Sequence, residues 1–133
     1  MRLEVEGQPP VAAVGEAELR VALSTLRSEG PASFACLTDE AGDYLQVASG
    51  GVTCMIERHE ARGHRHFRAF QNGASGIFAD GTQLVFGSGA IRMRSDEWFT
   101  IRDVEAVFVC FLRGEPLPRH VRWRDISGML SRS

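Results

Sequence analysis

The sequence contains no lysine, and all 15 of its Lys/Arg positions hold arginine. Acidic residues slightly outnumber the arginines, which gives a net charge of −2. Proteins that bind nucleic acid normally carry a basic stripe, so this composition argues against nucleic acid as a partner. Charges of both signs are mixed along the chain and select no other partner by themselves.

Cysteines are few, and long apolar runs are absent from the N-terminus. Cys36, Cys54 and Cys110 are odd in number, far apart and embedded in apolar stretches, which favours reduced thiols over a disulfide framework. The first residues, MRLEVEGQPP, hold no apolar run long enough for a signal peptide or a membrane span. These features predict a cytoplasmic protein that does not associate with a membrane.

Motifs that would identify a reaction are also missing. The sequence has no GxGxxG fingerprint, no Walker motif and no zinc deaminase signature. Ser88 lies in Gly87-Ser88-Gly89, which lacks the G-x-S-x-G spacing and the following helix of a nucleophile elbow, so we interpret it as a turn. We therefore expect no catalytic residues, no cofactor and no enzymatic activity.

The sequence does contain the pattern of a single α+β domain over residues 1–133. An apolar fraction of 44% suffices for a core in a chain of this length. Apolar residues at helical spacing predict an N-terminal helix over residues 16–29, ended by Gly30 and Pro31. A second helix is predicted over residues 100–113, and its nearly all-round apolar surface indicates burial between the sheet and another layer.

Short segments with strand-like composition are separated by turn residues between the two helices. Close spacing predicts an antiparallel meander, because parallel strands would need long crossover connections. Turns are expected at residues 40–43, 50–51 and 88–89. Strands are predicted over residues 2–6, 33–39, 44–49, 52–59, 64–70, 82–87, 90–94 and 120–126.

Three of the four histidines lie in one stretch, CMIERHEARGHRHFRAF. A hairpin with residues 60–63 as its loop divides this stretch into an apolar and a polar face. Cys54 lies on the apolar face, which argues against a mixed Cys/His zinc site. On the polar face the register pairs four side chains, His59 with His64 and Glu57 with His66. We interpret that face as solvated, with nothing enclosing the rings; a divalent metal held by these four side chains and a binding surface are the alternatives.

Acidic residues cluster in two further segments, TDEAGD and SDEWF. The first segment is explained without any function as a solvated hairpin tip. The second is explained in the same way by a tryptophan that packs at the start of a helix, with the acidic residues near its first turn. The functional interpretation is a contact surface for a partner protein, because acids attract basic partners and tryptophan is frequent at interface hot spots. The candidate contact residues are Asp39, Glu40, Asp43, Asp96, Glu97 and Trp98.

The order of these segments resembles one large immunity-protein family of bacterial polymorphic toxin systems. The resemblance covers residues 19–126 and includes SFACLTDEAGDYLQVAS, VEAVFVCFLRGEPLP and VRWRDI, where Trp123 corresponds to the late tryptophan of that family. The family has an α+β fold, and some members neutralise nucleic-acid deaminase toxins. The resemblance implies a non-enzymatic cytoplasmic inhibitor that binds a cognate toxin and blocks its active site.

Two other classes of function remain open from the residues alone. One is a small hydrolase, or a metal-dependent enzyme, that uses the cluster of His59, His64 and His66, or His120, as acid and base. Such an enzyme needs a concave pocket, which a convex hairpin face does not offer. The other is a homodimeric structural or ligand-binding domain that pairs through a sheet edge or exposed aromatic side chains.

Overall fold

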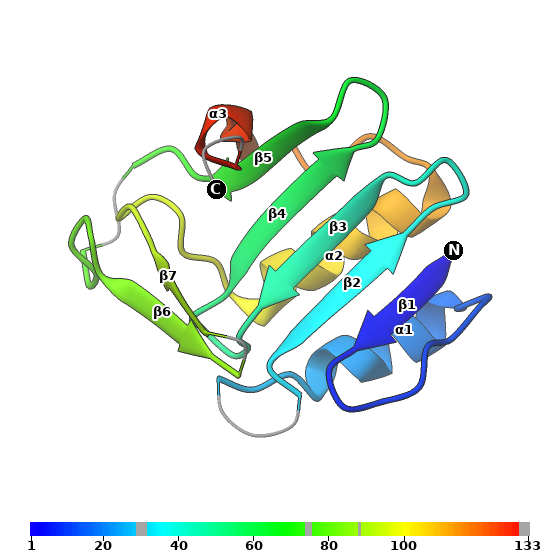
Figure 1. The fold of residues 1–133 in the computed structure, drawn as a ribbon. Helices are drawn as coiled ribbons and strands as arrows, with labels where there is room; N and C mark the ends of the chain where they lie inside the picture. Colours follow the sequence, from blue (N-terminus) through cyan, green and yellow to red (C-terminus); the bar gives the residue numbers. More distant parts are fainter. Residues whose placement is uncertain (29–31, 74–75, 88, 131–133) are drawn as a thin grey trace.

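The computed structural model describes residues 1–28, 32–73, 76–87 and 89–130 (Figure 1). Its helices are α1 (Glu16–Ser24), α2 (Ile101–Arg113) and α3 (Ser127–Leu130). Its strands are β1 (Arg2–Val5), β2 (Phe34–Thr38), β3 (Tyr44–Ala48), β4 (Met55–Glu60), β5 (Arg65–Phe70), β6 (Gln83–Phe86), β7 (Gly89–Arg92) and β8 (Arg122–Asp125). Six strands form an antiparallel sheet in the order β1-β2-β3-β4-β5-β8, and β6 pairs with β7 in a separate sheet. The α+β class with an antiparallel sheet is thus confirmed.

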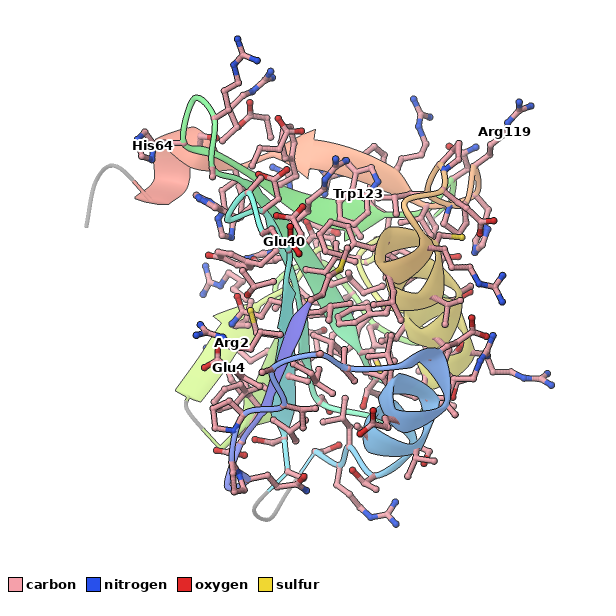
Figure 2. All side chains as sticks on the ribbon, turned by 90° about the vertical axis from the view of Figure 1, so that its right-hand side faces the viewer. Arg2, Glu4, Glu40, His64, Arg119 and Trp123 are labelled. Carbon is pink, nitrogen blue, oxygen red and sulfur yellow. The ribbon has the colours of Figure 1, made fainter. Side chains whose placement is uncertain are left out.

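Both longer helices pack on the same face of the six-stranded sheet, which we call the covered face (Figures 1 and 2). Strand residues alternate, so every second side chain enters the core between the sheet and the helices. The fully buried residues on these strands are Ala35, Leu37, Leu45, Val47, Ile56 and Ala69. The helices contribute Leu19, Leu23, Val104, Val107 and Phe108. Helix α2 packs against the sheet, as expected for a buried C-terminal helix, and it lies beside α1, with Arg102 and Ala106 exposed.

The helix ends follow local chemistry. The hydroxyl of Thr100 accepts a hydrogen bond from the backbone of Asp103, and the Asp103 carboxylate accepts one from the Thr100 backbone, which forms a capping box at the start of α2. Gly114 ends α2 in the left-handed region at φ 70°. Helix α1 ends at Ser24, earlier than expected, and the Ser24 and Thr25 hydroxyls there donate to backbone carbonyls of the last turn. The expected stop at residues 30 and 31 lies outside the described residues.

The β4–β5 hairpin differs from the expected register by two positions. His59 pairs with His66, where His64 was expected, and Glu57 pairs with Arg68. The loop is residues 61–64, and His64 adopts a left-handed conformation at φ 52°. A tertiary contact accounts for the shift, because the Asp43 carboxylate accepts a hydrogen bond from the backbone of Ala61. A two-residue shift keeps each side chain on its predicted face.

The second face of the six-stranded sheet, which we call the open face, carries no helix from α1 or α2 (Figure 1). The β6–β7 hairpin and the segment after it cover one end of this face through a second apolar cluster. Leu84, Met93 and Trp98 of that cluster pack against Ala48 and Met55 of the sheet. Among the described residues, no helix combines the length and apolarity of a membrane span.

Candidate functional site

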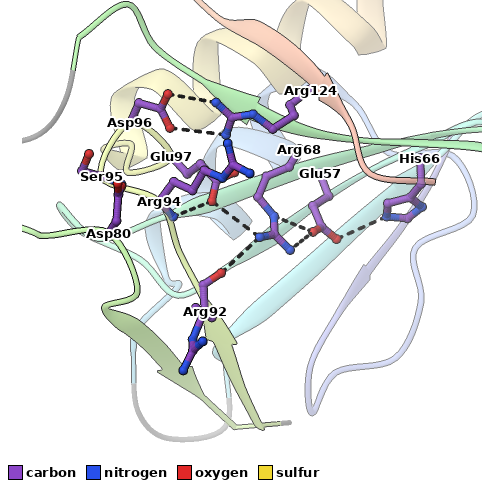
Figure 3. Close-up of polar contacts among 10 residues, drawn as sticks. All are labelled: Glu57, His66, Arg68, Asp80, Arg92, Arg94, Ser95, Asp96, Glu97 and Arg124. Carbon is purple, nitrogen blue, oxygen red and sulfur yellow. Dashed lines mark hydrogen bonds and ion pairs between the residues drawn. The ribbon is translucent and has the colours of Figure 1, made fainter. Parts of the chain in front are cut away.

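A chain of charged side chains crosses the open face from β4 to β8 (Figure 3). Glu57 lies at one end of it. Its Oε2 accepts hydrogen bonds from Nε and Nη2 of Arg68 at 2.9 and 2.8 Å, and its Oε1 lies 3.2 Å from Nε2 of His66. Arg68 also donates from Nη1 to the backbone carbonyl of Arg92 at 3.3 Å, which ties the β6–β7 hairpin to the sheet.

The other half of this chain is centred on Glu97. Its carboxylate accepts from Nη1 of Arg124 at 2.7 Å and from the backbone of Arg94 at 2.7 Å, and it lies 3.5 Å from Nη1 of Arg68. Arg124 makes a second, two-pronged contact with Asp96 at 2.9 and 3.3 Å. Every charged group in this ion network, as we call it, therefore has a close partner of opposite charge (Figure 3).

The electrostatics of the ion network favour the charged forms of Glu57 and Arg124. Burial acts to raise the pKa of Glu57, but the hydrogen bond from His66 and the charge of Arg68 together lower that pKa below its ordinary value. The hydrogen bond to Asp96 raises the pKa of Arg124. A buried set of charges with all its partners present holds the chain in one arrangement and offers no unfilled position to a ligand.

The histidines divide into three different environments. His66 is only 7% exposed and bonded to Glu57, so the expectation that nothing encloses the rings is wrong for this residue. His59 stacks on Tyr44 with ring centroids 4.8 Å apart, and burial followed by the nearby His66 and His64 lowers its pKa. His64 is exposed in the β4–β5 loop (Figure 2). These side chains border a shallow depression of about 560 Å³.

Within the described part of the chain, no three His, Cys, Asp or Glu side chains are placed to hold a metal ion. The alternative set of His59, His64, His66 and Glu57 shares one face, as the sequence suggested, but both oxygens of Glu57 are engaged by other side chains. A zinc or other divalent site would first have to break those contacts.

The structure separates the two acidic segments to opposite ends of β4. Asp39, Glu40 and Asp43 lie at the end of β4 that leads into the β4–β5 loop, where Asp43 contacts Ala61. The SDEWF segment lies at the beginning of β4, where Phe99 pairs with Cys54. A single contact surface made of both segments is therefore not what the fold provides.

The segment around Trp98 is largely interior. Glu97 is 2% exposed and Trp98 is 8% exposed, which corrects the expectation that they form part of an exposed surface. Trp98 stacks on Phe78 with ring centroids 4.2 Å apart. Asp96 is half-buried and bonded to Arg124. The packing of Trp98 agrees with the interpretation of this segment that assigns it no contact role, and the β6–β7 hairpin that packs against Trp98 directly precedes the segment in the chain.

The β2–β3 loop is held in shape by its own carboxylates. Asp39 Oδ1 accepts from the backbone of Ala41 and of Asp43 at 2.9 and 3.0 Å, which closes the turn. Asp43 Oδ1 accepts from Ala61 at 2.8 Å and joins the two loops. Glu40 is exposed at the tip (Figure 2). Two of the three predicted contact residues thus have a structural role in addition to any contact role.

A cavity of about 590 Å³ opens beside this loop, and we call it the loop-end pocket. It lies at the C-terminal end of α2, and its walls include Asp39, Asp43, Arg58, Phe111 and Trp123. Trp123 is half-buried and packs against the main core, as expected.

Arg58 is the residue that the sequence reasoning missed. Its guanidinium lies 6.0 Å from the centre of the Trp123 ring, and its nearest carboxylate, Glu60, is 3.8 Å away. Among the described residues, Arg58 Nε and Trp98 Nε1 are the two buried side-chain polar atoms without a hydrogen-bond partner. The available signal was alternation, since Arg58 follows Cys54 and Ile56 on the apolar face of β4.

Comparisons of this chain with protein-family models, with curated proteins and with solved structures find no match. The resemblance to immunity proteins therefore stays a prediction.

Proposed function

We propose that this chain is a non-enzymatic immunity protein that binds a cognate bacterial toxin in the cytoplasm and blocks the active site of that toxin. The proposal rests on the segment order and on the loop end, where acidic side chains border a pocket with aromatic walls. The contacts that we assign to the toxin are Asp39, Glu40 and Asp43.

The observation that carries this proposal is the fixed position of two carboxylates at the pocket. Backbone amides hold one oxygen of Asp39 and one of Asp43, so both side chains are oriented before a partner arrives. Preorganised groups lose little conformational entropy on binding, and more of the interaction energy then becomes affinity. Within the described residues the second oxygen of each carboxylate accepts no hydrogen bond, which leaves it for a basic side chain of the toxin.

The aromatic walls add the second ingredient of a protein-binding site. Trp123 and Phe111 are both half-buried at the pocket, so each has surface left to bury against a partner. Aromatic side chains at the centre of an interface contribute much of its binding energy when charged groups surround them.

The experiment is co-purification with the product of the adjacent gene, followed by measurement of the dissociation constant. Glu40→Lys reverses a charge at the exposed tip without touching a hydrogen bond of the loop, and we expect at least tenfold weaker binding. Glu105→Lys on α2 is the matched control, because Glu105 has only a 3.9 Å contact with Arg20. Absence of any complex at micromolar concentrations would contradict the proposal, as would equal binding by both variants.

One observation favours an enzyme as the second candidate. The depression on the open face brings together Tyr44, His59 and His66, and His66 is oriented by Glu57 as a general base would be. Turnover of ester or phosphodiester substrates by the purified chain, abolished in His59→Gln, would establish this alternative. The same assay without turnover, together with a toxin complex, would reject it.

A further inference from the structure

Arg58 occupies a position where its neighbours are apolar. In the sheet it pairs with Leu45 of β3 and Phe67 of β5, and Leu45 is fully buried on the covered face. An arginine on an apolar face is costly unless its guanidinium is paired. Here the Nε–H is buried, and the structure provides no acceptor for it within the described residues.

The terminal nitrogens of Arg58 are the accessible part of this side chain. The side chain is 30% exposed, and it forms part of the wall of the loop-end pocket. Among the described residues, the carboxylate within 4 Å of its guanidinium is that of Glu60 at 3.8 Å, beyond the length of a strong charge-assisted hydrogen bond. A planar guanidinium with free terminal N–H groups at a pocket matches the two oxygens of a carboxylate.

The opposite wall of the pocket decides which anion fits. Asp39, Asp43 and Glu115 bring negative charge to the cavity that Arg58 and Arg119 also line. A dianion such as a phosphate monoester would be repelled by the three carboxylates, whereas a single carboxylate on a chain that also carries a cation satisfies both kinds of wall. Trp123, stacked beside Arg58, supplies an apolar surface for the carbon chain of that ligand.

We propose that Arg58 binds a carboxylate side chain of the toxin, with a neighbouring basic side chain of the toxin on Asp39 and Asp43. This inference rests on the proposed function, because it takes the toxin as the occupant of the loop-end pocket. It names the partner chemistry: an acidic and a basic side chain close together on one segment. The toxin carboxylate then accepts hydrogen bonds from the terminal N–H groups of Arg58, which in the free chain have only the 3.8 Å contact with Glu60 within the described residues.

The first experiment measures toxin affinity for three variants of the full chain. Arg58→Met removes the guanidinium and keeps the apolar stem, and we expect about ten- to a hundredfold weaker binding. Arg58→Lys keeps the charge but loses the two-pronged geometry, and binding should weaken by an intermediate factor. Arg102→Met, an exposed arginine on α2, is the control and should bind as the wild-type chain does. Circular dichroism establishes that each variant is folded.

The second experiment probes the pocket without the toxin. N-acetyl-aspartate N-methylamide is titrated to millimolar concentrations, and the Arg58 Nε–H and Trp123 indole signals are followed by NMR against matched sodium chloride. We expect shifts with the carboxylate alone, and their loss in Arg58→Met.

The outcomes separate the two proposals. A toxin complex that Arg58→Met binds as tightly as the wild-type chain overturns the role of Arg58 and leaves the immunity function standing. Probe binding without any effect on toxin affinity assigns the pocket to a free small carboxylate and also overturns the inference. No complex with the wild-type chain overturns both proposals.

Discussion

Arg68 and Arg58 lie on adjacent strands of one sheet, but the surroundings of their guanidinium groups are opposite. On the open face, Arg68 is 11% exposed and contacts Glu57, Glu97 and the carbonyl of Arg92. On the covered face, Arg58 is 30% exposed, with a single carboxylate 3.8 Å away. The contacts of Arg68 explain its presence structurally, whereas Arg58, whose buried Nε–H has no acceptor within the described residues, requires another explanation.

This contrast redirects attention from the histidines to the loop end. The stretch rich in histidine and charge is the more conspicuous in the sequence, but the carboxylate of Glu57 in it already contacts Arg68 and His66. The loop-end pocket has fewer unusual residues, yet its wall includes Arg58, whose buried Nε–H has no hydrogen-bond partner within the described residues. Binding energy is available where polar groups still lack partners in the free protein.

The largest expected effect on stability is that of Arg68→Met, which removes the paired arginine of the open face. This change leaves Glu57 and Glu97 with one fewer cation each in a buried environment, and we expect a loss of about 3–5 kcal/mol in the free energy of unfolding. Urea denaturation measures it. Arg102→Met, exposed on α2, should change stability by less than about 0.5 kcal/mol. A loss below about 1 kcal/mol for Arg68→Met would show that the ion network does not hold the open face together.

A smaller effect is expected for Glu57→Gln, and it depends on pH. Because the pKa of Glu57 is lowered in the folded chain, its contribution to stability is present above the ordinary glutamate pKa and is lost as the pH falls through the lowered value. At pH 7 we expect a loss of about 2 kcal/mol, since the glutamine cannot pair with the charge of Arg68. Thermal unfolding between about pH 7 and about pH 3 should show a flatter acid limb for the variant than for the wild-type chain. Parallel curves would contradict this account.

The sequence was sufficient for the class of fold and for most elements. Alternation and turn residues located the strands of the six-stranded sheet, and the Thr100 capping box and Gly114 located α2. The predictions that were wrong concerned the register of the β4–β5 hairpin and the end of α1. The hairpin register moved because Asp43 holds Ala61, and α1 stopped at Ser24.

The candidate site was harder to predict than the fold. Asp39 and Asp43 were found because they cluster in the sequence, but their hydrogen bonds within the loops were not foreseen. Glu97 and Trp98 were candidates for a contact surface, with packing at the start of α2 as the other interpretation, and the structure buries both residues. Arg58 was not predicted at all, and the absence of an acceptor for its Nε–H within the described residues depends on the three-dimensional packing, which no local pattern encodes.

The stability of Arg58→Met tests the central claim most directly. Methionine keeps the apolar stem beside Trp123 and removes an unpartnered buried donor, so the free energy of unfolding in urea should rise by about 1 kcal/mol. The account therefore predicts that methionine at this position stabilises the free chain, in contrast to methionine at position 68. A loss of stability in Arg58→Met would mean that Arg58 is satisfied within the folded chain, and the case for a ligand at the loop-end pocket would be contradicted.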